Sequence, residues 1–432
     1  MNHTKRDQRT AEWFSKARVG VFYHWGRFTG GGNSHEDPET SIPLKYSTVE
    51  EFERAPPDPA RIARNMTAVA KYFGARYVIF TSNHSNDGYT MLYPTQCEGY
   101  RNRTTKDYIQ PLADECHKQG LKLLLYTQHD PSHAVTAHDG VCITEEYRTV
   151  DTYAKLFEAS TLEMMERYGD SIDGFWIDGQ LPERVQHIPA MIHEKYPHHI
   201  VVVNNETDFR SDDVDYATTE FLSNPDIDPA YCRPLGLIHR HEQWGIEPPL
   251  SDYNEDIPTC GGWWYQGSIA PGQPFLIDPT FIVKQMVSSL GQRRKWNYVL
   301  GLGLDITGSL PPELVPTADA CHAFLEWSAE SIYDTVGGEG SFFLPGRWND
   351  GAFGSVTVDW EDKTLCYLHV TTPPTGETLE IPTTAEEIST LTDLRTGESI
   401  PFALENGKLC LSYHWTDTKT YGDTVLRVTV KA

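Results

Sequence analysis

The sequence predicts an α/β fold: an irregular (β/α)8-like (TIM) barrel over residues 1–335, followed by a small C-terminal antiparallel β-sandwich over residues 336–432. Short apolar runs alternate with amphipathic helical stretches through the first three quarters of the chain, which is typical of a parallel sheet. These runs fill about eight strand positions, the number that a barrel requires. From about Gly337 the runs become short and β-branched and are separated by turn residues, which predicts antiparallel strands.

The first half of the expected barrel follows this alternation closely. Two of its helical stretches end at Gly74 and Gly120, where glycine can adopt the left-handed conformation that closes a helix. The expected strands are Val19–Tyr23, Tyr77–Thr81, Leu121–Thr127 and Gly174–Asp178, and the expected helices are Pro59–Phe73, Thr104–Gln119, Asp151–Tyr168 and Arg184–Tyr196.

The second half is less regular. The seventh strand position, near residues 250–270, has weak strand character, so we expect the barrel to be irregular there. The expected strands are Ile200–Asn204, Tyr216–Thr219 and Asn297–Gly301, and the expected helices are Pro279–Leu290 and Thr317–Ser331. In the β-sandwich we expect no helix, only the strands Ser355–Trp360, Leu365–Thr371, Thr378–Ile381, Leu409–Trp415 and Thr424–Val430.

Composition limits the classes of partner. The chain has 432 residues and a net charge of −25, which argues against nucleic acid and anionic membranes as partners. No apolar run reaches transmembrane length, and the polar N-terminus lacks the apolar core of a signal peptide. We therefore expect a cytoplasmic protein, or a secreted one if a leader was removed. The eight cysteines include no CxxC pair, which predicts reduced thiols. The oligomeric state stays open.

Four consecutive predicted strands end in residues that could carry chemistry. These are His24 and Trp25, then His84, then Tyr126 and His129, then Trp176 and Asp178. Since the carboxyl ends of parallel strands meet at one rim, we expect one polar pocket with an aromatic wall, which suits a neutral, hydroxyl-rich ligand such as a sugar. A single histidine is more often structural, and Asp178 alone could cap the next helix. Packing does not readily explain four strand ends of the same kind.

A metal site is the competing hypothesis. His129, His133 and His138 lie in one loop with Asp130 and Asp139. Zinc sites in barrels usually draw histidines from several strand ends, this loop contains no HxH, and HExxH does not occur in the chain. We therefore expect no metal and no organic cofactor. The nucleophilic serine motif GxSxG, the phosphate loop and the dinucleotide motif GxGxxG do not occur in the sequence.

Glycoside hydrolysis needs a second carboxyl group besides Asp178. We expect it on a later loop, and the candidates are Glu206, Glu220, Glu242, Glu247 and Glu255. Glu255 is the first choice because it precedes the aromatic run Trp263–Tyr265 in what we expect to be a long loop. Glu220, at the end of a predicted strand, is the reserve.

The N-terminal block Glu12–Gly26 resembles the opening block of the α-L-fucosidases of glycoside hydrolase family 29. Further blocks resemble that family in the same order, from about residue 11 to 335. They are Gly74–Thr81 with His84 and Asp87–Tyr89, Gly120–Tyr126, Phe175–Gly179, Asp215–Glu220, Trp296–Gly301 and Phe324–Tyr333. The family usually has adjacent histidines before Asp-Gly, whereas Ser85-Asn86 stand there in this chain. Its usual Glu-Trp-Tyr box after the first strand is missing from residues 30–46.

The resemblance implies a retaining exo-glycosidase that removes a terminal α-L-fucosyl residue from a small-molecule or oligosaccharide substrate. It implies Asp178 as nucleophile and, by a looser match, Glu255 as acid/base. The substrate-binding residues that we infer with it are His24, Trp25, His84, Tyr126, His129, Trp176, Glu220 and Trp264. Three alternatives stay open: a glycosidase for a related sugar such as an α-L-galactoside, a metal-dependent barrel hydrolase, and a non-catalytic sugar-binding relative.

Overall fold

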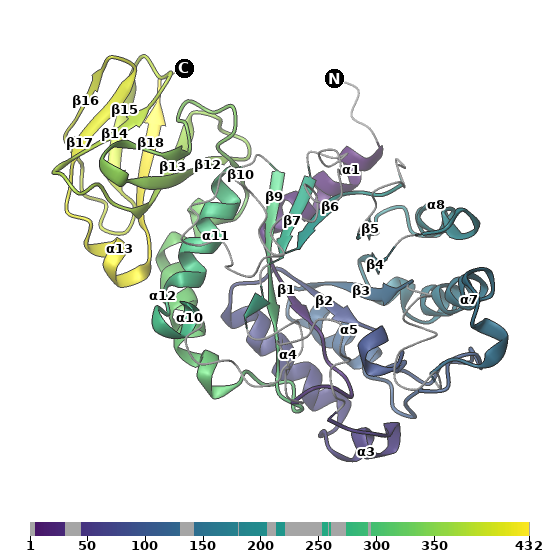
Figure 1. Ribbon diagram of the computed structural model, residues 1–432. Coiled ribbons are helices and arrows are strands. Elements are labelled where there is room, and N and C mark those ends of the chain that lie inside the picture. Colours follow the sequence, from purple (N-terminus) through teal and green to yellow (C-terminus); the bar gives the residue numbers. More distant parts are fainter. Residues whose placement is uncertain are drawn as a thin grey trace.

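The computed structural model describes residues 5–30, 45–129, 142–179, 181–204, 213–220, 253–257, 259–260, 274–292 and 295–431. A curled sheet of parallel strands lies at its centre with helices around it, and antiparallel sheets, drawn in green to yellow, form a separate lobe (Figure 1). The expected fold class is confirmed.

Eight of the nine strands described in the central sheet form a ring. Their order is β5-β4-β3-β2-β1-β9-β7-β6, and a parallel bridge between Val202 and Tyr216 joins its two ends. All described pairs are parallel, and β8 (Thr259–Cys260) continues β7 along β9. The ring strands are β1 (Val19–Tyr23), β2 (Tyr77–Thr81), β3 (Lys122–Gln128), β4 (Gly174–Asp178), β5 (Ile200–Val203), β6 (Ala217–Glu220), β7 (Tyr253–Ile257) and β9 (Lys295–Leu302). The seventh strand position, whose strand character in the sequence is weak, is thus occupied by the strand β7.

Side chains along the ring strands alternate between two apolar clusters. Phe175 and Ile177 of β4 belong to the outer cluster, which includes residues of the surrounding helices, whereas Trp176 between them belongs to the inner cluster. This is the period of two that a strand imposes. The inner cluster also contains Phe22, Tyr77, Ile79, Leu124, Tyr126, Ile200, Val202, Tyr216, Ile257 and Val299.

Helices surround the ring. They are α1 (Lys5–Glu12), α2 (Phe14–Ala17), α3 (Val49–Arg54), α4 (Pro59–Tyr72), α5 (Ile109–Lys118), α7 (Val150–Tyr168), α8 (Ile188–Lys195), α10 (Pro274–Ile277), α11 (Phe281–Gln292) and α12 (Val315–Ile332). One of them, the short α2, places Phe14 and Ala17 in the inner cluster. The expected helix Thr104–Gln119 begins later because the Asp107 carboxylate accepts the N–H groups of Ile109 and Gln110 and so starts the first turn there. Among the described residues, no helix is long and apolar enough to cross a membrane.

The C-terminal lobe consists of two antiparallel sheets. One contains β10 (Thr335–Gly337), β11 (Gly346–Arg347), β12 (Phe353–Asp359), β13 (Leu365–Thr372), β15 (Ile388–Asp393) and β18 (Thr424–Val430), and the other contains β14 (Thr378–Pro382), β16 (Phe402–Glu405) and β17 (Lys408–Ser412). The expectation of no helix was wrong, because α13 (Thr416–Tyr421) follows β17 and closes at Gly422, which has a φ of 89°. The domain boundary near residue 336 stays a prediction.

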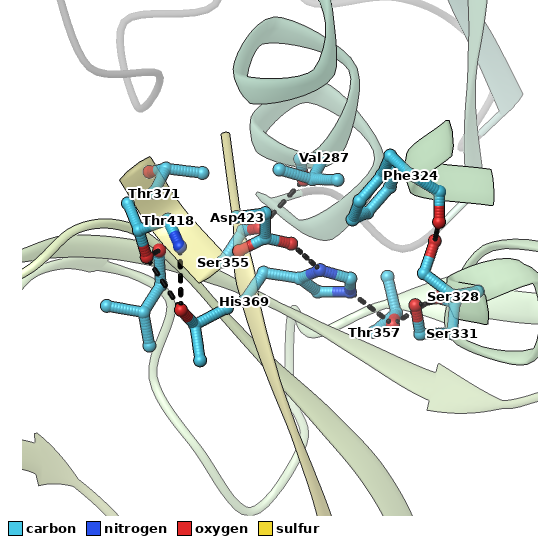
Figure 2. Close-up of polar contacts among 12 residues, drawn as sticks. Val287, Phe324, Ser328, Ser331, Ser355, Thr357, His369, Thr371, Thr418 and Asp423 are labelled. Carbon is cyan, nitrogen blue, oxygen red and sulfur yellow. Dashed lines mark hydrogen bonds and ion pairs between the residues drawn. The ribbon is translucent and has the colours of Figure 1, made fainter. Parts of the chain in front are cut away.

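A buried chain of hydrogen bonds joins this lobe to the barrel helices. His369 lies between Asp423 and Thr357, with its Nδ1 2.6 Å from Asp423 Oδ2 and its Nε2 3.0 Å from Thr357 Oγ1 (Figure 2). Thr357 Oγ1 in turn donates to the carbonyl oxygen of Ser331 in α12, and Ser355 donates to that of Val287 in α11. The side chains of His369 and Asp423 are fully buried. The lobe is therefore attached through groups that cannot exchange these partners for water.

We predict that Asp423→Ala lowers the free energy of unfolding by about 3–5 kcal/mol, because it leaves the buried His369 without its carboxylate partner. Urea denaturation of the whole chain measures this. The control is Lys408→Ala, which removes a pair with Glu380 whose side chains are 46% and 36% exposed. We expect the control to change stability by at most about 1 kcal/mol. Equal effects of the two substitutions would contradict the prediction.

Candidate active site

The half-buried carboxylate of Asp178 stands at the carboxyl end of β4. Gly179 follows with a φ of 89°, a left-handed conformation that turns the chain away from the strand directly after the carboxylate. The carbonyl oxygen of Asp178 accepts the backbone N–H of His129 at 2.8 Å. The position of Asp178 is therefore fixed by backbone pairing on the side of β3.

Side chains of β3 and of Asn204, which directly follows β5, donate hydrogen bonds to the Asp178 carboxylate. Tyr126 Oη donates to Oδ2 at 2.6 Å, Asn204 Nδ2 donates to Oδ1 at 2.8 Å, and Gln128 Nε2 lies 3.4 Å from Oδ2. Thr218 Oγ1 in β6 donates to Asn204 Oδ1 at 2.5 Å and so fixes that amide. These donors favour the ionised form of the carboxylate and hold it in one orientation.

Gln128 also links Asp178 to the segment that carries His84. Its Oε1 accepts the backbone N–H of Ser85 at 2.7 Å. Gln128 and Asn204 were not among the site residues expected from the sequence. Asn204 ends a predicted strand and Gln128 directly follows one, so the strand-end position that pointed to Asp178 also pointed to them.

Aromatic rings form a stack beside the carboxylate. Tyr126 is stacked on Trp176 at 5.3 Å and on His84 at 5.5 Å, with interplanar angles of 20° and 13°. Phe22 meets the edge of Trp176 at 5.1 Å. The expected aromatic wall therefore includes Tyr126, with Trp176 and His84 each stacked on it.

His24 follows β1 and is 4% exposed. Its ring centroid lies 5.3 Å from those of both His84 and Tyr126. Burial, with a smaller contribution from His84, lowers the pKa of His24 well below its usual 6.5. His24 is thus a neutral imidazole that can donate or accept a hydrogen bond.

Trp25 and His129 lie elsewhere than expected. Trp25 packs in the outer cluster against Phe52 and Tyr108, at 5.1 and 5.2 Å. His129 packs its ring against Tyr153 and Phe157 of α7. Each residue comes one position after an inward-facing residue, so strand alternation turns it outward. The backbone N–H of His129 donates to the carbonyl oxygen of Asp178.

The expectation that Glu255 lies on a long loop was wrong, because it is in the middle of β7. Its carboxylate is fully buried, accepts Tyr77 Oη at 2.7 Å and accepts Trp176 Nε1 at 3.3 Å. Burial raises the pKa of Glu255 to about 7, and hydrogen bonds from its partners, that of Tyr77 being the strongest, oppose the rise. Glu255 thus lies inside the ring, joined to the indole of Trp176.

Several expected residues are only partly placed. Glu220 is the last residue of β6, and its backbone pairs with Ile257. Trp264, Glu206, Glu242 and Glu247 lie outside the described residues, as do His133, His138, Asp130 and Asp139 of the proposed metal loop. Within the described part of the chain, no group of three or more His, Cys, Asp or Glu side chains is arranged to hold a metal ion.

A hydrogen-bonded carboxylate beside stacked rings, at the rim of a parallel barrel, is an arrangement suited to breaking a glycosidic bond, and the class of protein is a glycoside hydrolase. A sequence model described as alpha-L-fucosidase matches residues 1–327. The chain therefore belongs to the α-L-fucosidase family.

Solved structures share this fold at low sequence identity. α-L-Fucosidase isoenzyme 1 from Paenibacillus thiaminolyticus superposes with a TM-score of 0.73 at 18% identity, covering 99% of this chain and 100% of that chain. A trapped covalent intermediate of a GH29 α-L-fucosidase from Bacteroides thetaiotaomicron gives 0.69 at 17%, covering 100% and 98%. The Thermotoga maritima α-fucosidase gives 0.66 at 18%, covering 96% of each chain. No match was found among curated proteins.

We predict that His24 stays neutral between about pH 5 and pH 8, because burial disfavours its cation. The NMR signals of the ring nitrogens, assigned by their loss in His24→Gln, should not titrate in this range. Since the pKa of His24 is lower in the folded than in the unfolded chain, acidification below about pH 6.5 should destabilise the wild type more than the variant. A titration with a midpoint near 6.5 would contradict the prediction.

Proposed function

We propose that this protein is a retaining α-L-fucosidase, which removes a terminal α-L-fucosyl residue by double displacement. The observation that carries the proposal is the Asp178 carboxylate, which is held by Tyr126 and Asn204 at the rim of the barrel and remains half-buried. Family membership and the trapped covalent intermediate of a relative with the same fold support it.

In the first step, an oxygen of Asp178 bonds to the anomeric carbon while the bond to the leaving oxygen breaks. An acid protonates that oxygen, and the sugar is left as an ester of Asp178. In the second step the same acid/base takes a proton from water, the water oxygen bonds to the anomeric carbon, and Asp178 is released as a carboxylate. The donors on Asp178 orient it for attack and stabilise the carboxylate that departs.

The ring stack fits the sugar class. A 6-deoxy sugar presents a methyl group that needs an apolar surface, and the ring of Trp176 is stacked on Tyr126, which donates to the carboxylate. His24 and His84 lie against the same Tyr126 ring and offer polar atoms for sugar hydroxyls. An α-L-galactoside differs by a hydroxyl at that methyl position, so a direct comparison of the two substrates tests the assignment.

The acid/base must reach the leaving oxygen. Glu255, our first choice from the sequence, is fully enclosed and bonded to Tyr77 and Trp176, which does not support direct contact with the aglycone. Glu220 ends β6 two residues beyond Thr218, which binds the amide of Asn204. We therefore propose Glu220 first as the acid/base and keep Glu255, Glu206, Glu242 and Glu247 as its competitors.

We predict that Asp178→Gly lowers kcat on nitrophenyl α-L-fucoside by about 10³-fold or more, because no nucleophile remains. Added azide should restore part of the activity and give a fucosyl azide of inverted configuration. Circular dichroism checks that the variant is folded. Turnover near that of the wild type would remove the central claim.

Assays of the wild type distinguish the alternative functions. If it hydrolyses the α-L-fucoside faster than it hydrolyses the α-L-galactoside, the proposed sugar is supported. If EDTA abolishes the activity, a metal-dependent hydrolase is favoured instead. If the wild type binds fucose but hydrolyses neither glycoside, the protein is a sugar-binding relative.

We predict that Glu220→Ala loses activity mainly on natural linkages, whose poor leaving groups need protonation. The first step on an activated aryl fucoside should suffer less, and azide should restore turnover with retained configuration. The same assays on alanine variants of the four competitors provide the comparison. If one of those variants shows this signature and Glu220→Ala does not, the role belongs to that residue.

A further inference from the structure

The interior of the barrel holds a carboxylate that the proposed chemistry does not use directly. Glu255 is 0% exposed and lies among the aromatic and aliphatic side chains of the inner cluster. Its two oxygens have different partners, because Tyr77 donates to Oε1 and Trp176 donates to Oε2. Burying a carboxylate in such a place costs free energy of folding, because burial removes its hydration.

The chain makes room for this arrangement. A Cβ atom at Gly20 of β1 would lie 2.6 Å from Cζ of Tyr77, so the absence of a side chain there lets the Tyr77 ring cross β1 toward Glu255. Asn297, the partner of Glu255 in β9, donates to the carbonyl oxygen of Phe14 at 2.8 Å. The surroundings of Glu255 are thus built from several strands.

A short series of contacts leads from Glu255 to the nucleophile. The Glu255 carboxylate holds the indole N–H of Trp176, the indole is stacked on Tyr126, and Tyr126 Oη donates to Asp178 at 2.6 Å. Trp176 also precedes Asp178 by two residues on β4, so both face the ring interior.

We propose that Glu255 is a positioning residue, which anchors the indole of Trp176 and thereby fixes Tyr126 and the Asp178 carboxylate for attack. This inference rests on the proposed role of Asp178. It assigns Glu255 no proton transfer to or from the substrate. A shift of the ring stack would change the angle of Asp178 to the anomeric carbon, and misplacement by about 1 Å can cost about 10²-fold in rate.

The test compares Glu255→Gln with Glu255→Leu on nitrophenyl α-L-fucoside. Glutamine can accept from Trp176 with its oxygen and donate to Tyr77 with its amide, so kcat should stay within about threefold of the wild type. Leucine fills the space without an acceptor, so kcat should fall about 10- to 100-fold, with a smaller change in KM. If leucine leaves kcat unchanged, the proposal is wrong.

An acid/base role gives the opposite pattern. Glutamine would then be as harmful as leucine, the loss would depend on the leaving group, and azide would restore turnover to Glu255→Ala. If instead Asp178→Gly retains activity, the proposed function fails and not the positioning role alone. The two failures are therefore distinguishable in one set of assays.

Tyr77→Phe is the matched control, because it removes the hydrogen bond from Tyr77 and leaves the one from Trp176. We expect it to lower kcat less than leucine at Glu255 does. Fluorotryptophan NMR gives a readout besides activity: the signal assigned by Trp176→Phe should move in Glu255→Leu and move little in Glu255→Gln. An unmoved signal in both variants would overturn the proposal.

The pH dependence of stability distinguishes a positioning role of Glu255 from a purely structural one. The pKa of Glu255 is about 7 in the folded chain, above its usual 4.5, so the wild type loses stability as the pH rises through this interval. The titratable groups facing it are Tyr77 and Tyr216, with the buried Arg18 beside Tyr77. Glu255→Leu removes the buried charge but leaves the buried donors of Tyr77 and Trp176 without this acceptor, so its deficit in melting temperature relative to the wild type should shrink between about pH 5 and pH 8 while its deficit in kcat persists. Parallel losses of both would indicate a structural role.

Discussion

The alternation of side chains along the parallel strands determines what the barrel can contain. Half of each ring strand faces a closed interior, and the residues that fall there are Phe22, Leu124 and Val202 as well as Tyr77, Tyr126 and Trp176. Polar atoms inside such a ring must be satisfied by one another, because bulk water is absent. Glu255 therefore accepts from Tyr77 and Trp176, and each donor finds in it a strong acceptor.

The same alternation explains which parts of the site could be predicted from the sequence. The strand-end positions of Asp178, Tyr126 and His24 were visible because each follows or ends a continuous apolar run, and the structure brings these residues together. Trp25 and His129 were included because they stand near strand ends in the sequence. Proximity to a strand end takes no account of alternation, and both side chains turn outward to pack against Phe52 and α7.

Other parts of the site depend on contacts that no local pattern shows. β7 reads Tyr-Asn-Glu-Asp-Ile, which lacks the apolar run typical of a buried strand, so Glu255 was expected on a loop. It is a strand because β6 and β9 pair with it on both sides. The link from Thr218 through Asn204 to Asp178 likewise joins three strands and appears only when the ring closes.

Two carboxyl groups of one barrel show why access, and not pKa alone, decides which group can act as the acid. The pKa of Glu255 is raised to about 7 by burial, which is the value that a general acid needs near neutral pH. The burial that raises the pKa also separates the carboxyl group from any leaving oxygen, because Glu255 is fully enclosed in the ring, where Tyr77 and Trp176 donate to it. Asp178, two residues from Trp176, keeps part of its surface exposed and is held by donors from β3 and from the end of β5. Because Asp178 lies at the rim and Glu255 lies deep in the ring, Asp178 can contact the substrate, whereas Glu255 can act only through its neighbours.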